Sequence, residues 1–162
     1  MRVFFDSAKA IAQQLKKKQQ SVSVAESSTG GLISANLLSV PGASSFFIGG
    51  SVVYTLKSRR EFLNFDSERV KRLEPLSAEM VLEFARAARD KLDTTWGIAE
   101  LGAAGPTGTP YGHDPGVSVI GIAGPVEATL KIETLSDNRQ ENMLAFTEAA
   151  LNLFNQTLSS CN

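Results

Sequence analysis

Hydrophobic positions along this chain of 162 residues follow two different periods. Spacings of three and four residues, typical of helices with one buried face, predict helices over 8–20, 29–39, 57–62, 67–73, 78–92 and 138–158. Alternating or continuous apolar runs rich in β-branched residues predict strands over 22–25, 46–55, 95–101, 117–123 and 128–135. Polar residues before three of these helices are the expected N-caps: Asp66, Ser77 and Asp137.

The order of these elements indicates the fold class. Strands separated by helices are typical of a layered α/β domain. The run 117–123 is almost wholly apolar, which favours a central position in the sheet, and its hairpin partner 128–135 makes the sheet mixed. The pair Gly49-Gly50 predicts a bulge or a close backbone approach. We find no internal repeat or linker, so we expect one domain over 1–162.

Composition narrows the class of protein. A hydrophobic content of 43% with 20% charged residues is ordinary for a globular protein. The net charge of −1 offers no field that attracts nucleic acid. No segment has the ~20 apolar residues of a membrane span, so no membrane partner is expected. The lone Cys161 cannot form an internal disulfide, which favours a reducing compartment and leads us to expect a cytoplasmic protein.

The segment Glu26-Ser27-Ser28-Thr29-Gly30-Gly31 lies between a predicted strand and a predicted helix. Hydroxyls and free N–H groups at a helix N-terminus suit an anion or a developing oxyanion. The alternative is an ordinary capped turn in which Ser28 or Thr29 is the N-cap. In open α/β sheets such loops meet beyond the strand ends, together with the glycine-rich segments 102–108 and 114–116.

Candidate chemistry follows from the residues near these loops. A serine nucleophile needs a base and preorganised donors for its oxyanion. The candidate bases are His113, Lys57 and Tyr54, whereas the guanidinium of Arg59 stays protonated near pH 7. Without a cluster of metal ligands, a Walker motif or G-x-G-x-x-G, we expect neither a metal nor a cofactor.

These segments resemble the CinA C-terminal domain family, whose signature A-E-S-C-T-G-G is similar to residues 25–31. The resemblance continues through 40–44, 47–54, 76–77, 102–106 and 135–139. It implies a three-layer α/β/α sandwich with a mixed, mostly parallel sheet, in the stand-alone form of the domain. It also implies hydrolysis of the carboxamide of nicotinamide mononucleotide, which yields nicotinic acid mononucleotide and ammonia.

The resemblance also assigns site residues. It implies that Ser27 is the nucleophile and that Tyr54, Lys57 and Arg59 form the stretch that carries the base. The implied substrate-binding residues are Ser28, Thr29, Gly30, Gly31, Gly102, Ala103, Gly105 and Arg139.

The chain departs from the family pattern where the base is expected. The family has lysine at the position of Arg59, and on a helix Lys57 would point about 200° away from it. Leu101 also replaces a small hydroxyl residue of the family. Three hypotheses stay open: an amidohydrolase with Lys57 or His113 as base, a non-catalytic binder of a phosphorylated nucleotide-like ligand, and a homo-oligomer without a small-molecule role.

Overall fold

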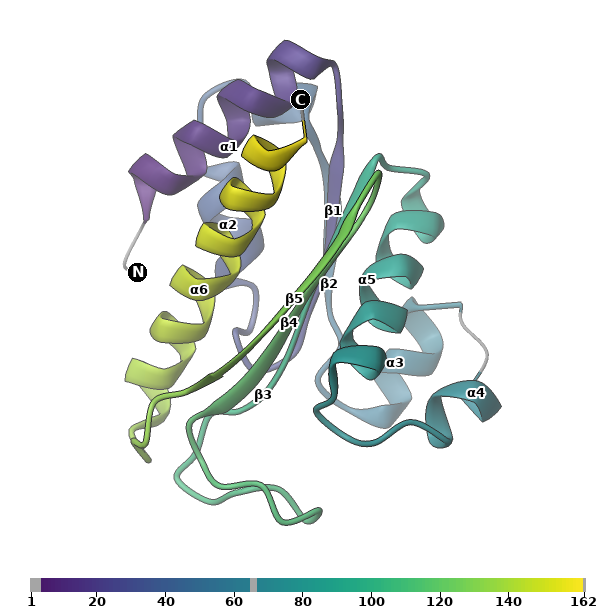
Figure 1. The fold of residues 1–162 in the computed structure, drawn as a ribbon, viewed down its shortest axis with the longest axis vertical. Coiled ribbons are helices and arrows are strands. Elements are labelled where there is room, and N and C mark those ends of the chain that lie inside the picture. The colour runs from purple at the N-terminus through teal and green to yellow at the C-terminus, as the bar shows by residue number, and fades with distance from the viewer. Residues whose placement is uncertain (1–3, 65–66, 162) are drawn as a thin grey trace.

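The computed structural model describes residues 4–64 and 67–161, which fold around one five-stranded sheet (Figure 1). The strands are β1 (Val22–Glu26), β2 (Phe47–Val52), β3 (Trp96–Ala103), β4 (Val117–Ala123) and β5 (Glu127–Glu133). The α-helices are α1 (Phe5–Lys18), α2 (Leu32–Leu38), α3 (Leu56–Phe62), α4 (Ser67–Lys71), α5 (Ala78–Leu92) and α6 (Arg139–Ser160).

The strand order is β2-β1-β3-β4-β5. β1 pairs in parallel with both β2 and β3, whereas β4 is antiparallel to β3 and β5, so four of the five strands run in one direction. Helices α1, α2 and α6 cover one face of the sheet, and α3, α4 and α5 lie on the other (Figure 1). The expected three-layer sandwich with a mixed sheet is therefore confirmed.

Alternation along the strands supplies a hydrophobic core to each face. On β3, Trp96 and Ile98 point to the side of α1 and α6, where the Trp96 ring meets Phe154 edge-on at 5.7 Å between centroids. Alternate residues of β3 face the other way, so Ala99 and Leu101 pack against α5. Both faces of the central strands are buried, which explains their nearly continuous apolar sequence.

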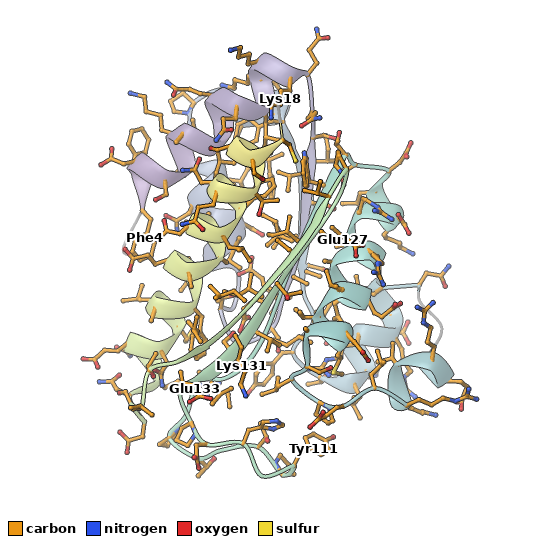
Figure 2. The ribbon with its side chains drawn as sticks, viewed as in Figure 1. Phe4, Lys18, Tyr111, Glu127, Lys131 and Glu133 are labelled. Atoms are coloured by element: carbon orange, nitrogen blue, oxygen red, sulfur yellow. The ribbon has the colours of Figure 1, made fainter. Side chains whose placement is uncertain are left out.

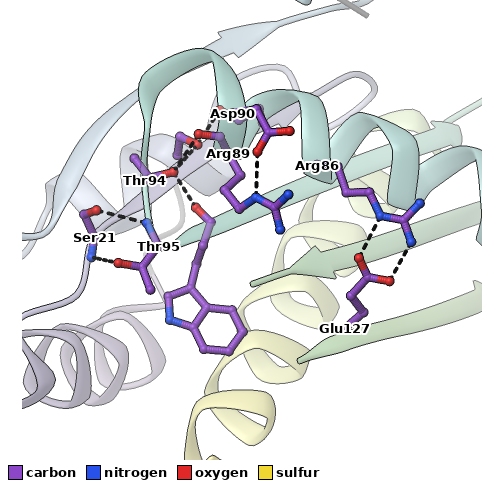
Figure 3. Close-up of polar contacts among 10 residues, drawn as sticks. Ser21, Arg86, Arg89, Asp90, Thr94, Thr95 and Glu127 are labelled. Carbon is purple, nitrogen blue, oxygen red and sulfur yellow. Dashed lines mark hydrogen bonds and ion pairs between the residues drawn. The ribbon is translucent and has the colours of Figure 1, made fainter. Parts of the chain in front are cut away.

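Close backbone contacts lock α5 onto this sheet. A Cβ at Gly97 would lie 2.0 Å from the carbonyl oxygen of Ala85, so only glycine permits this approach. Beside it, Ser21 and Thr95 exchange two main-chain to side-chain hydrogen bonds, both 3.2 Å long (Figure 3). The two hydrogen bonds align the first residues of β1 and β3, so that the carboxyl ends of both strands lie at the same edge of the sheet.

Several predicted boundaries need correction. The helix expected from Thr29 begins at Leu32, because Gly30 and Gly31 adopt positive φ angles of 63° and 99°. The strand expected to reach Thr55 ends at Val52, where the chain turns into α3. Asn138 rather than Asp137 caps α6, since its side chain accepts the N–H of Glu141. The expected cap Asp66 lies outside the described residues.

The predictions for Ser77 and for the pair Gly49-Gly50 are confirmed. Ser77 caps α5 by accepting the N–H of Met80 at 3.1 Å. The β1–β2 register skips one residue between Phe47 and Gly49, which is the expected irregularity in β2. A Cβ at Gly50 would lie 2.6 Å from the Ser34 hydroxyl, so this glycine also allows the expected close approach. Among the described helices, none is long and apolar enough to cross a membrane.

Candidate functional site

The segments that follow β1, β2 and β3 gather at one edge of the sheet, because these three strands are parallel neighbours (Figure 1). The Ser27 N–H donates to the Glu100 carbonyl at 3.1 Å, and the Val53 N–H donates to the Glu26 carbonyl at 2.8 Å. The predicted site residues on these segments are therefore brought to one place by the sheet.

The N-terminus of α2 is occupied by a side chain of the protein itself. The buried carboxylate of Glu26 accepts the N–H groups of Gly31, Ile33 and Ser34 at 2.9–3.0 Å, and the Ser34 hydroxyl at 2.8 Å. Helix N-termini favour such anions. The Gly30 N–H donates to the Ser27 carbonyl at 3.2 Å, so the amides of Gly30 and Gly31 are both bonded within the protein. The expected N-caps Ser28 and Thr29 are wrong, because the N-cap of α2 is Gly31.

A second buried carboxyl group, Glu100 on β3, organises the rest of the loop. It accepts the Ser27 and Thr29 N–H groups at 3.2 and 3.0 Å, and contacts the hydroxyls of Ser28 and Ser118 at 2.5 and 3.0 Å. Burial raises the pKa of Glu100 above its usual range, and these hydrogen bonds oppose that rise. Sequence reasoning missed Glu100; the signal was a single carboxyl group inside an apolar strand.

Two polar groups of the loop stay free of internal partners. Among the described residues, the Ser28 amide is the one main-chain N–H between Ser27 and Ser34 that makes no hydrogen bond. The Ser27 hydroxyl makes none either. Ser27 is only 4% exposed, yet no described side-chain oxygen is both buried and unpaired, so its hydroxyl oxygen must reach solvent. An amide directly after a nucleophile can stabilise its oxyanion.

Arg59 and Lys57 lie on different sides of α3. The Arg59 guanidinium is half-buried, stacks on the Phe84 ring at 5.2 Å, and donates from Nε to the Val53 carbonyl at 3.2 Å. Burial lowers the pKa of Arg59 from its usual value, while Tyr111 and Glu100 act in the opposite direction. Lys57 is exposed on the same helix. The helical geometry therefore separates Lys57 from the position that the family gives to its base.

Tyr54, Arg139 and Gly105 form one connected group. Arg139 donates to the Gly105 carbonyl at 2.5 Å and to the Tyr54 hydroxyl at 3.1 Å, and its guanidinium lies 6.0 Å from the Tyr54 ring centroid. The buried Asn142 amide donates to the Ala104 and Ser136 carbonyls at 2.8 Å. The start of α6 thus fixes the glycine-rich loop after β3 and holds Gly105 next to Arg139.

Gly102 and Ala103 form the end of β3 that lies at the site. A Cβ at Gly102 would lie 2.6 Å from the Ser28 hydroxyl and 2.8 Å from the Glu100 carboxyl, so this glycine lets the two segments meet. Ala103 is buried and pairs with Val117 of β4. His113 is held inside its own loop, where its Nδ1 lies 2.8 Å from the Thr109 hydroxyl, and makes no hydrogen bond to Ser27.

A cavity of about 400 Å³ opens beside Arg59. Leu56, Met80 and Leu101 form apolar walls, and Arg60 and Lys71 add positive charge; Gly102, Thr109 and Tyr111 complete one side. Figure 2 shows Tyr111 on the loop beyond the end of the sheet. No described residue of the cavity lining is acidic, so the cavity suits an anionic ligand. Within the described ranges, no group of His, Cys, Asp or Glu could hold a metal ion.

Known proteins share both the sequence and the fold. A CinA-like protein of Pseudothermotoga lettingae is 34% identical over 145 residues, which are 90% of this chain and 35% of that protein. One from a Cyanothece strain is 36% identical over 118 residues, covering 73% of this chain and 28% of its own length. This chain therefore spans about a third of the length of the curated relatives it matches.

Solved structures agree. The competence damage-inducible protein A from Klebsiella pneumoniae superposes with a TM-score of 0.90 at 20% identity, over 99% of this chain and 100% of that one. The competence/damage inducible protein CihA from Agrobacterium tumefaciens gives 0.84 at 27% identity, over 98% and 99%. The CinA C-terminal domain family matches residues 5–158. With the signature loop, the sheet and these relatives in agreement, the chain belongs to the CinA C-terminal domain family.

Proposed function

We propose that this protein is a slow amidohydrolase that acts on the carboxamide of nicotinamide mononucleotide or a similar phosphorylated ligand, with Ser27 as nucleophile. One observation carries this proposal: the Ser27 hydroxyl and the Ser28 N–H stay free while the other described donors of the loop are bonded. A free hydroxyl next to a free amide is the minimum pair for attack on a carbonyl and stabilisation of the oxyanion.

The chemistry follows from these two groups. Ser27 Oγ attacks the amide carbon and loses its proton to a solvent water, while the Ser28 N–H stabilises the oxyanion. The C–N bond then breaks as solvent protonates the nitrogen, which leaves as ammonia, and a second water hydrolyses the serine ester to release the acid and restore Ser27. Arg59 stands at the family's lysine position and cannot accept the serine proton. A missing general base costs about 10²–10⁴ in rate, so we expect slow turnover.

The surroundings fit a phosphorylated ligand. Arg59, Arg60 and Lys71 line the neighbouring cavity, and a guanidinium can bind a phosphate through two parallel hydrogen bonds. Arg139 is held by Gly105 and Tyr54, so its position is fixed before a ligand arrives. A cytoplasmic location is consistent with the single free Cys161, because thiols stay reduced in that compartment.

A second candidate function is binding without hydrolysis. It is favoured by the guanidinium of Arg59, which is anchored to Val53 and Phe84 and offers charge without a proton acceptor. In that case the cavity holds the mononucleotide and Ser27 is idle.

The experiment incubates pure protein with nicotinamide mononucleotide and measures ammonia over hours. We expect slow release that disappears in Ser27→Ala, with Ser44→Ala as the control because Ser44 is an exposed serine remote from the loop sequence. Release that persists in Ser27→Ala would contradict the assigned nucleophile. No release, together with a rise in melting temperature on adding the mononucleotide, would favour the binder.

A further inference from the structure

Glu26 and Glu100 share one hydroxyl group. Thr29 Oγ1 lies 2.7 Å from Glu26 Oε1 and 3.1 Å from Glu100 Oε2. Both carboxyl groups are fully buried. A threonine hydroxyl carries one proton, so it cannot donate to both carboxylates at once. If both were ionised, two buried negative charges would meet across an oxygen that satisfies only one of them.

Glu26 has more main-chain N–H donors than Glu100. Its partners include three main-chain N–H groups, those of Gly31, Ile33 and Ser34. These groups can only donate, and each Glu26 oxygen accepts at least one of them, whereas Oε1 of Glu100 contacts hydroxyls alone. A proton on either oxygen of Glu26 would therefore compete with an N–H donor. The α2 N-terminus adds a favourable field for negative charge.

Glu100 has partners that can reverse their roles. Its Oε1 contacts the hydroxyls of Ser28 and Ser118, and Ser118 also lies 3.2 Å from the Leu101 carbonyl. If Ser118 donates to Leu101, its oxygen is free to accept a proton from Glu100. Oε2 would keep the Ser27 and Thr29 N–H groups in either state.

The charged neighbours agree with this assignment. From β1, Glu26 faces Glu100 through Thr29, and two carboxyl groups that share a site do not ionise together. From α3, Arg59 acts on Glu100 at a distance without a hydrogen bond to it. β4 contributes the neutral Ser118. Burial without an ion pair raises the pKa of Glu100.

We infer that Glu100 carries a proton at neutral pH while Glu26 is ionised, and that Glu100 is a positioning residue which holds the 27–31 loop as a neutral acid. The inference goes beyond the proposed function and does not depend on it. Loss of the proton would place a second buried negative charge beside Ser27 and the free Ser28 amide.

The test compares two isosteric variants of the full chain, Glu100→Gln and Glu26→Gln. Glutamine resembles a neutral acid and releases no proton on unfolding, so at pH 7 the folding equilibrium constant of Glu100→Gln should be no lower than that of the parent. Glu26→Gln places an amide group against main-chain donors and should lower the constant at least tenfold below that of the parent. In infrared spectra at pH 7, the carbonyl stretch of a buried neutral carboxylic acid should be present in the parent and absent from Glu100→Gln.

A pH series tests for the proton on Glu100 through the pH dependence of the folding equilibrium. Because the folded state raises the pKa of Glu100, it holds a proton that the unfolded chain releases above about pH 4.3. The folding equilibrium constant of the parent, relative to Glu100→Gln, should therefore fall by up to tenfold per pH unit above that value until the folded pKa is reached.

Three results would overturn the inference: a flat ratio from pH 5 to 8, a neutral-acid band that persists in Glu100→Gln, or a loss in Glu100→Gln as large as in Glu26→Gln. If Glu26→Gln does not fold, the infrared band and the pH ratio still decide. Neither readout involves hydrolysis, so failure here is distinct from failure of the proposed function.

Discussion

Individual side chains decide what the 27–31 loop can bind. The buried Glu26 and Glu100 carboxyl groups engage most of its donors and leave the Ser28 amide and the Ser27 hydroxyl. The sequence indicates which residue types the loop contains. It does not indicate that Glu100, more than 70 residues later, is the partner, because that pairing depends on β3 lying next to β1.

Arg59→Lys tests whether the missing base limits the rate. A half-buried lysine can lose its proton, whereas the guanidinium cannot, so turnover of nicotinamide mononucleotide should rise by roughly 10²-fold or more. Ammonia release at pH 8 measures the gain, and melting curves check that the loss of the contact with Phe84 leaves the fold intact.

Arg60→Lys is the control, because Arg60 is exposed at the same cavity and lies outside the family's base position. Equal rates for the parent and Arg59→Lys would contradict the explanation that a missing general base limits turnover.

At the scale of elements, the helix ends show which structural features the local sequence can predict. Ser77 was predictable as a cap because it directly precedes a clear helical pattern. Asp137 was the expected cap of α6, but the backbone places the neighbouring Asn138 at the helix boundary. The predicted start of α2 at Thr29 was wrong. The N-cap residue is Gly31, and the side chain that accepts its N–H belongs to Glu26, five positions earlier.

Ser77→Ala should lower the free energy of unfolding by about 1 kcal/mol, because the Met80 N–H loses its acceptor. Ser77→Asp keeps an acceptor oxygen and adds a favourable charge at the helix N-terminus, so it should stay close to the parent. Urea titration of the three proteins measures both. Equal losses in the alanine and aspartate variants would show that the cap is not responsible.

At the scale of the whole molecule, one ion pair ties a helix to the far edge of the sheet. Arg86 of α5 donates from Nε and Nη2 to the Glu127 carboxylate of β5 at 2.7 and 2.6 Å (Figure 3). Its Nη1 donates to Glu83 at 2.8 Å. The hydrogen bonds from Arg86 lower the pKa of Glu127.

Two expectations about the whole molecule stay predictions: that residues 1–162 form a single domain, and that the protein assembles as a homo-oligomer.

Glu127→Gln should lower the free energy of unfolding by up to about 1 kcal/mol at low salt, and by less at high salt, because the pair is partly exposed. The depressed pKa means that this contribution is present above the unfolded pKa of about 4.3 and is lost as the pH falls through the folded value. Urea titrations at two salt concentrations and at pH 3 and 7 measure it.

Glu133→Gln is the matched control, since Glu133 lies 3.6 Å from Lys131 with both side chains more than half exposed. A larger effect for Glu133→Gln than for Glu127→Gln would contradict the assignment.

The sequence by itself determined the helices, the strands, the mixed α/β class and the motif around Ser27, because periodicity, caps and glycines act over a few residues. The tertiary structure decided which donors remain available to a ligand. That outcome depends on burying two carboxyl groups from neighbouring strands at one point, and hydrogen bonds between distant segments leave no periodic trace in the chain.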